Sequence, residues 1–158
     1  MMNTSLAVVD VNNGEYLGSI TGMMPNIRHI LVKDGYIYLA ITNLGYIQRG
    51  KIDAVIDSLK NNKLNITQWE NIYVGKGIRT MEISEDGLYL FAAVNEESKI
   101  AIVDLSKLQT ICKIDADSFP VGLDITKDKN YLIVTAQGKY GIGGNSVMVY
   151  KVDYKNKN

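Results

Sequence analysis

Short apolar runs separated by polar turns recur three times along this chain. Each copy has an apolar run, a turn that contains an aspartate and a second apolar run; the copies begin at Ile27, Ile78 and Val121, and their turns contain Asp34, Asp86 and Asp128. Asp-Gly between apolar runs is a strong hairpin signal, because glycine adopts the positive φ that tight turns require. The pattern therefore predicts three strand–turn–strand units.

Third and fourth strands accompany these hairpins. An apolar run begins at Ser5, Ser98 and Ser146, and more alternating runs follow at residues 15–20 and 108–114. The inner runs are apolar throughout, as in strands that are covered on both faces, whereas alternation is typical of an outer strand with one wetter face. Each complete unit is therefore predicted to have four strands.

The stretch between residues 43 and 74 permits two registers. A third strand at 51–57 would space Asp10, Asp57 and Asp104 by 47 residues. However, the apolar positions of this stretch are spaced as on one face of a helix, at Ile52, Val55, Ile56 and Leu59. We therefore prefer a strand at 45–53, a short helix at about 54–61 and an outer strand at 65–74.

Repeats of roughly 40 to 50 residues with four strands each are typical of β-propeller blades. The sequence predicts an all-β fold: a β-propeller fragment of about three four-stranded blades, with one short helix inserted near 54–61. Residues 1–158 form one partial propeller, with a blade remnant at 4–22, blades at 23–75 and 76–117, and a partial blade at 118–155.

Composition and charge exclude several classes of protein. Seventeen basic and 17 acidic residues balance each other, so we expect no nucleic-acid binding. The apolar runs are too short for a membrane-spanning segment. Because Cys112 is the single cysteine, the chain has no intrachain disulfide and no cysteine-based zinc site. We expect Cys112 to be a small buried hydrophobic residue.

Several strand segments resemble a known repeat. The second strands contain Phe91-Ala-Ala-Val and Ile133-Val-Thr-Ala, each preceded by Tyr-Leu, and residues 100–105 are Ile-Ala-Ile-Val-Asp-Leu. From about residue 5 to 154 the chain resembles the YVTN-repeat β-propellers, which are typically seven-bladed. This resemblance implies a periplasmic, secreted or cell-surface protein, although residues 1–26 show no signal peptide. Some relatives are lactonases or carry cofactors; we predict no cofactor here.

Three blades and a fraction do not close a ring of ordinary size. Each terminal blade would expose a flat apolar face, and large unpartnered patches are unusual on monomers. We therefore expect either the missing blades of a parent chain about twice as long, or a second copy that packs its open faces against the first. A small anionic ligand or a protein is a further expected partner.

Equivalent arginines are the main candidates for a ligand site in the central channel. Arg28 and Arg79 occupy matching positions near the start of the innermost strands, whereas the third copy has Gly122 there. Two guanidinium groups can bind a carboxylate or phosphate; alternatively, each arginine pairs with a neighbouring carboxylate. His29 is the single histidine and is more readily explained as a structural residue.

Two asparagines complete the candidate site. Asn43 and Asn95 follow their second strands and could present amides at the channel mouth, although turn residues need no further explanation. The glycine-rich stretch 141–145 lacks the Lys-Ser/Thr of a phosphate-binding loop, so we interpret it as a widened hairpin.

The sequence favours a non-enzymatic scaffold that binds a ligand or a protein. It contains no triad, metal-ligand motif or paired-carboxylate motif above background, so we predict no catalytic residue and no metal site. The alternative is a lactonase-like hydrolase with an active site at the channel mouth, in which Glu82 and Asp124 of the inner strands could bind a metal ion.

Overall fold

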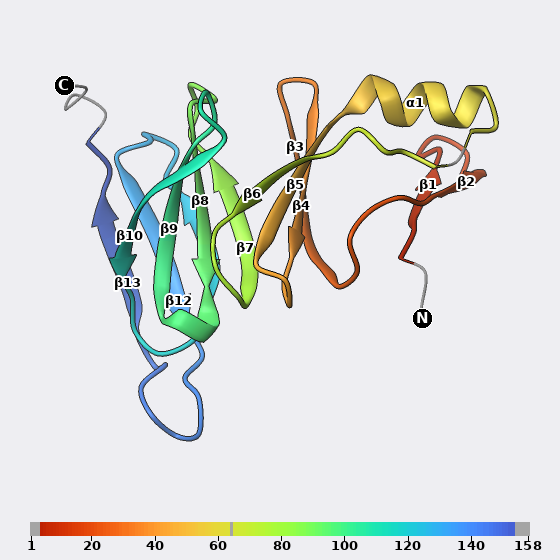
Figure 1. Cartoon of the computed structure of the whole chain (residues 1–158). Helices are drawn as coiled ribbons and strands as arrows, with labels where there is room; N and C mark the ends of the chain where they lie inside the picture. The colour runs from red at the N-terminus through yellow and green to blue at the C-terminus, as the bar shows by residue number, and fades with distance from the viewer. Residues whose placement is uncertain (1–3, 64, 154–158) are drawn as a thin grey trace.

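The computed structural model describes residues 4–63 and 65–153 and contains four antiparallel sheets arranged in a row (Figure 1). The first sheet has two strands, β1 (Leu6–Val9) and β2 (Tyr16–Ile20). The second has four strands, β3 (Ile27–Lys33), β4 (Tyr36–Ile41), β5 (Tyr46–Lys51) and β6 (Glu70–Tyr73). Helix α1 (Ile52–Lys60) lies between β5 and β6.

The third sheet again has four strands and the last has three. The third consists of β7 (Ile78–Ile83), β8 (Tyr89–Val94), β9 (Lys99–Asp104) and β10 (Gln109–Asp115), with the 3-10 turn η1 (Asn95–Glu97) between β8 and β9. The last consists of β11 (Pro120–Ile125), β12 (Tyr131–Ala136) and β13 (Val147–Lys151). Within each sheet, strands that follow one another in the sequence are paired, which confirms the predicted up-and-down units.

Three apolar layers hold the row together. One layer lies between the second and third sheets and includes Tyr38, Met81 and Leu90. A second lies between the third and last sheets and includes Phe91 and Leu132. The strands β4 and β8 are therefore buried on both faces, which explains why they are apolar at almost every position.

The remaining layer packs the first sheet and α1 against the second sheet. It joins Ile20 of β2 and Val55 of α1 to Leu39 of β4. The helix begins at Ile52, two residues before the predicted start, and Ile56 of its predicted apolar face is 42% exposed. The inserted helix and the preferred register are thus confirmed. The helix face that packs against the sheets is narrower than the apolar spacing indicated.

The outer strand of the second sheet is shorter than predicted. Only residues 70–73 of the predicted 65–74 pair with β5. The preceding segment bends because the Trp69 indole N–H donates to the carbonyl of Ile66 at 3.1 Å, and the ring packs in the same layer as Val55. A Cβ on Gly50 would lie 2.7 Å from the indole ring, so this strand position has room only for glycine.

Candidate ligand-binding site

Each innermost strand contains a β-bulge near its start. The register with the second strand shifts between Ile27 and His29, between Ile78 and Met81, and between Pro120 and Gly122. Arg28 and Arg79 lie within the first two bulges, on neighbouring strands and at the same end of their sheets. A bulge interrupts the regular alternation of side chains along a strand, and both arginines lie at such an interruption.

Backbone contacts show which residue is equivalent in the last sheet. The residue immediately before each inner strand has a positive φ; these residues are Asn26, Gly77 and Phe119. The carbonyl of each accepts the backbone N–H of the residue that follows the second strand, from Thr42, Asn95 and Gln137 respectively. This alignment places Val121, and not Gly122, at the position of the arginines. The sequence alignment was one residue out of register there, because Val121 matches Ile27 and Ile78 in apolar character.

Neither arginine is neutralised by a carboxylate. Among the residues that the structure describes, no ion pair involves Arg28 or Arg79. Arg28 is exposed. The guanidinium of Arg79 lies 5.9 Å from the ring centroid of Phe119, and its Nε is buried without a hydrogen-bond partner. The alternative that both arginines serve as blade-ordering ion pairs is therefore not supported.

His29 joins two sheets. Its Nδ1 accepts the backbone N–H of Met81 at 3.2 Å. The proton of the neutral ring therefore lies on Nε2. β7 is the edge strand of its sheet, and Met81 pairs with Ala92 at a position whose N–H faces that edge and not β8. Burial lowers the pKa of His29 from 6.5, and the charge of Glu82 opposes this shift. Thr80 occupies the equivalent position in β7, and its hydroxyl donates to the carbonyl of Val121 at 2.6 Å.

The two asparagines do not occupy equivalent positions. Asn43 is exposed in the turn between β4 and β5. Asn95 is 3% exposed and begins η1, and its backbone N–H donates to the carbonyl of Gly77 at 3.0 Å. By that contact Asn95 matches Thr42 rather than Asn43. The structure therefore brings Arg28, Arg79 and His29 to one region of the inner strands and leaves Asn43 on an outward-facing turn.

Two residues near Arg79, Phe119 and Lys139, gave no distinctive signal in the sequence. The ammonium group of Lys139 lies 5.3 Å from the ring centroid of Phe119, the same ring that Arg79 contacts, and 5.4 Å from that of Tyr140. Lys139 belongs to the 137–146 connection between β12 and β13, the widened hairpin that the glycines indicated. Two cations therefore contact the same aromatic ring at this end of the sheets.

One face of the last sheet is uncovered. Tyr38, Phe91 and Ile133 occupy equivalent positions, three residues before the paired ends of β4, β8 and β12; they are 4%, 5% and 36% exposed. Val149 pairs with Ile133 and is 61% exposed, whereas its equivalent Ile102 packs in the apolar layer beside Phe91. We call this uncovered surface the open face; its cross-strand residues are Tyr131, Ile133, Thr135, Val147, Val149 and Lys151.

A cavity of about 250 Å³ lies at the rim between β10 and β13. It is lined by Ile111, Cys112, Ile114, Leu132 and Tyr150, among others. Within residues 4–63 and 65–153, the last sheet has three strands and the two preceding sheets have four, and the cavity lies beside the unpaired edge of β13. The prediction of a buried Cys112 is wrong for this reason: the thiol is exposed on β10, where no further strand covers it.

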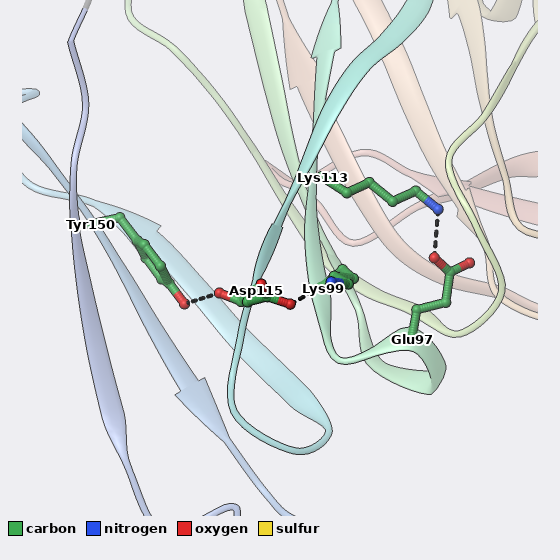
Figure 2. A network of polar contacts seen from close by, with 5 residues as sticks. All are labelled: Glu97, Lys99, Lys113, Asp115 and Tyr150. Carbon is green, nitrogen blue, oxygen red and sulfur yellow. Dashed lines mark hydrogen bonds and ion pairs between the residues drawn. The ribbon is translucent and has the colours of Figure 1, made fainter.

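Polar contacts link the rims of the last two sheets (Figure 2). The Tyr150 hydroxyl of β13 donates to the backbone carbonyl of Asp115 at 2.8 Å, and Lys99 pairs with the Asp115 carboxylate. Lys113 pairs with Glu97 at 2.5 Å. Burial, followed by the charge of Asp115, raises the pKa of Tyr150. Such half-exposed ion pairs contribute little stability; the Tyr150 contact fixes where the edge of β13 lies.

The described part of the chain contains no group of three or more His, Cys, Asp or Glu residues able to hold a metal ion. Within the same residues, neither helix has the length and apolar character needed to cross a bilayer.

Comparisons with known proteins define the fold. No family model matches the chain, and no curated protein matches it. Hydrazine synthase of Kuenenia stuttgartiensis is similar in structure, with a TM-score of 0.75, 18% identity and coverage of 93% of this chain and 40% of that one. A proposed 6-phosphogluconolactonase of Bacteroides fragilis is also similar, with a TM-score of 0.68, 15% identity and coverage of 93% of this chain and 44% of that one. The computationally designed Ika4 protein has a TM-score of 0.63 and 14% identity, and the match covers 94% of this chain and 80% of that one.

These similarities and the four antiparallel sheets show that the chain has a β-propeller fold. At such low identities the similarity concerns the fold alone. The chain spans less than half the length of the first two structures, which agrees with the sheet that is left open.

Proposed function

We propose that this chain is part of a non-enzymatic β-propeller scaffold that binds its partner through the open face. The observation that carries the proposal is the exposure of Ile133 and Val149, at positions where Phe91 and Ile102 are covered by the next sheet. Within the chain, the equivalent position is covered in two sheets, and in both cases the covering surface is the next propeller blade. The missing blades of a parent protein and a second copy of the chain both supply such a surface.

The experiment measures self-association and accessible apolar surface. We expect the chain either to associate in size-exclusion chromatography with light scattering, or to stay monomeric and bind an apolar dye such as ANS. The variant Ile133→Lys/Val149→Lys should lose both properties. The matched control is Val11→Lys, because Val11 is 93% exposed and far from the open face. A monodisperse wild-type monomer that binds no dye contradicts the proposal.

The same proposal includes a small anionic ligand at the arginine end of the sheets. It is supported by Arg28 and Arg79, which lack carboxylate partners within the described residues. Guanidinium groups that are not neutralised by a carboxylate are suited to bind a carboxylate or phosphate. On its resemblance to YVTN-repeat proteins, we assign the scaffold to the periplasm, the cell surface or the secreted fraction; fractionation of the source cells tests this assignment.

A lactonase-like hydrolase is the second candidate, favoured by the structural similarity to the proposed 6-phosphogluconolactonase. Glu82 lies close enough to His29 to affect its pKa, and Asp124 is exposed on β11. A lactone-hydrolysis assay with and without added Ca²⁺ or Mg²⁺ separates the two functions. Metal-dependent turnover that is lost in Glu82→Gln would favour the hydrolase over the scaffold.

A further inference from the structure

The connection between the second and third strands is longer in the last sheet than in the two complete sheets. It has four residues at 42–45, four at 95–98 and ten at 137–146. All three connections lie at the end of the sheets that carries Arg28 and Arg79, and the long one projects beyond the others (Figure 1). We call residues 137–146 the long loop.

The long loop has a fixed base. The carboxylate of Asp117 accepts the N–H of Ser118 at 2.6 Å, the N–H of Gly144 at 3.0 Å and the hydroxyl of Ser146 at 2.5 Å. These hydrogen bonds lower the pKa of Asp117, with that from Ser146 the largest cause. Gly138 and Gly144 are in such close contact that a Cβ on Gly144 would lie 1.7 Å from the Gly138 nitrogen. The two arms of the loop are therefore pinched together.

The tip of the loop presents apolar side chains to solvent. Tyr140 is 90% exposed and Ile142 is 71% exposed. Single exposed apolar side chains are common on protein surfaces, but these two lie two residues apart at the tip of the same projecting loop. Tyrosine also combines a large contact area with few rotatable bonds, which suits it to recognition surfaces.

Positive charge lies next to this tip. The Lys139 ammonium lies between the rings of Phe119 and Tyr140, at 5.3 and 5.4 Å from their centroids, and Arg79 lies 5.9 Å from the centroid of Phe119. Neither cation forms an ion pair with any residue in 4–63 or 65–153. Contact with aromatic faces stabilises a cation only modestly, so both charges are still able to bind an anion.

We propose that the long loop and Arg79 form one site for an anion that carries an aromatic or aliphatic group. Arg79 and Lys139 bind the carboxylate or phosphate, and Tyr140 and Ile142 contact the apolar part. This inference rests on the anionic ligand of the proposed function and narrows it to an amphipathic one. It does not depend on the open face, since Ile133 and Val149 are not part of the site.

The experiment is a titration of the ¹⁵N-labelled full chain, followed by the amide shifts of residues 137–146. The probes are phenyl phosphate, benzoate, inorganic phosphate and phenol. We expect phenyl phosphate or benzoate to bind at least about tenfold more tightly than either inorganic phosphate or phenol, a difference of about one charge-assisted or apolar contact. Tighter binding of phenyl phosphate than of benzoate indicates a phosphate ligand, and the reverse order indicates a carboxylate ligand.

Variants separate the two halves of the site. Lys139→Gln and Arg79→Gln should each weaken the aromatic anion about tenfold, whereas Tyr140→Ala should remove its advantage over inorganic phosphate. Lys60→Gln and Tyr16→Ala, exposed residues outside the site and outside the open face, are the matched controls. Saturating concentrations that leave the loop amides unmoved, or equal losses in the controls, overturn the inference. Self-association of the same samples reports separately on the open face.

Discussion

The hydrogen bond between His29 and Met81 predicts that the stability of this protein depends on its single histidine. The N–H of Met81 faces the free edge of its sheet, because β7 is an edge strand, and Nδ1 of His29 accepts it at 3.2 Å. The substitution His29→Ala removes the acceptor and leaves a buried amide without a partner. His29→Asn keeps an acceptor oxygen at about the place of Nδ1 and removes the titratable ring.

The magnitude follows from the unsatisfied amide. Leaving a buried donor unpaired costs about 1–3 kcal/mol, which is a large fraction of the roughly 5–15 kcal/mol that stabilises a typical domain. With a urea m-value of about 2 kcal/mol/M, His29→Ala should lower the unfolding midpoint by about 0.5–1.5 M. His29→Asn should recover most of that loss.

The pH dependence has a definite sign. Because burial lowers the pKa of His29 from 6.5 in the folded state, the stabilising hydrogen bond is fully present above pH 6.5. It is lost as the pH falls from 6.5 through the lowered pKa, since the protonated Nδ1 no longer accepts. One proton gives a slope of at most about 1.4 kcal/mol per pH unit. The charge of Glu82 opposes the shift, so Glu82→Gln should steepen the dependence.

The assay is urea unfolding of wild type, His29→Ala and His29→Asn at pH 7.5, 6.5 and 5.5. Wild type should lose stability between pH 6.5 and 5.5, and His29→Asn should lose much less over the same interval. The reasoning is refuted if His29→Ala unfolds at the wild-type urea concentration, or if wild type and His29→Asn show the same pH dependence.

Two further substitutions test contacts on which the site depends. Thr80→Val removes the hydroxyl that donates to the Val121 carbonyl and should cost about 1 kcal/mol in urea unfolding; Thr67→Val, at an exposed position, should cost less. Gly144→Ala should lower the melting temperature more than Gly141→Ala: both glycines have positive φ, which costs other residues about 1–2 kcal/mol, but a Cβ meets backbone only at Gly144. Equal effects in either pair would contradict the contact assignments.

The repeat made most of the fold predictable. Short apolar runs with Asp-Gly turns specify hairpins locally. Because the hairpins recur along the chain, each sheet packs against a neighbouring sheet of the same kind. The helix was predictable because its apolar spacing conflicted with a strand. The outer strand at 65–74 was predicted too long, because the Trp69 indole bonds to Ile66, a contact between side chain and backbone that strand periodicity does not encode.

The candidate site was less predictable. The third copy was matched at Gly122 because the apolar Val121 was aligned with Ile27 and Ile78, whereas the structure has Pro120 at their position. The pairing of His29 with Met81 depends on an amide at the edge of a neighbouring sheet, a contact that the pattern of one strand does not encode. Arg79 and Lys139 both contact the ring of Phe119; Phe119 stands where the other copies have Asn26 and Gly77, and Lys139 lies in a connection that is longer than in the other copies.

The bulges also suggest how a further blade would attach. At each junction inside the chain, the residue after the arginine bonds to the next inner strand: His29 to Met81, and Thr80 to Val121. The equivalent residue of the last sheet is Gly122, which has no side chain to do so. A blade placed on the open face would therefore lack this hydrogen bond, and Ile133 and Val149 would supply apolar contacts there. For this reason, lysine at those two positions should disrupt such a junction more completely than the loss of one hydrogen bond disrupts the others.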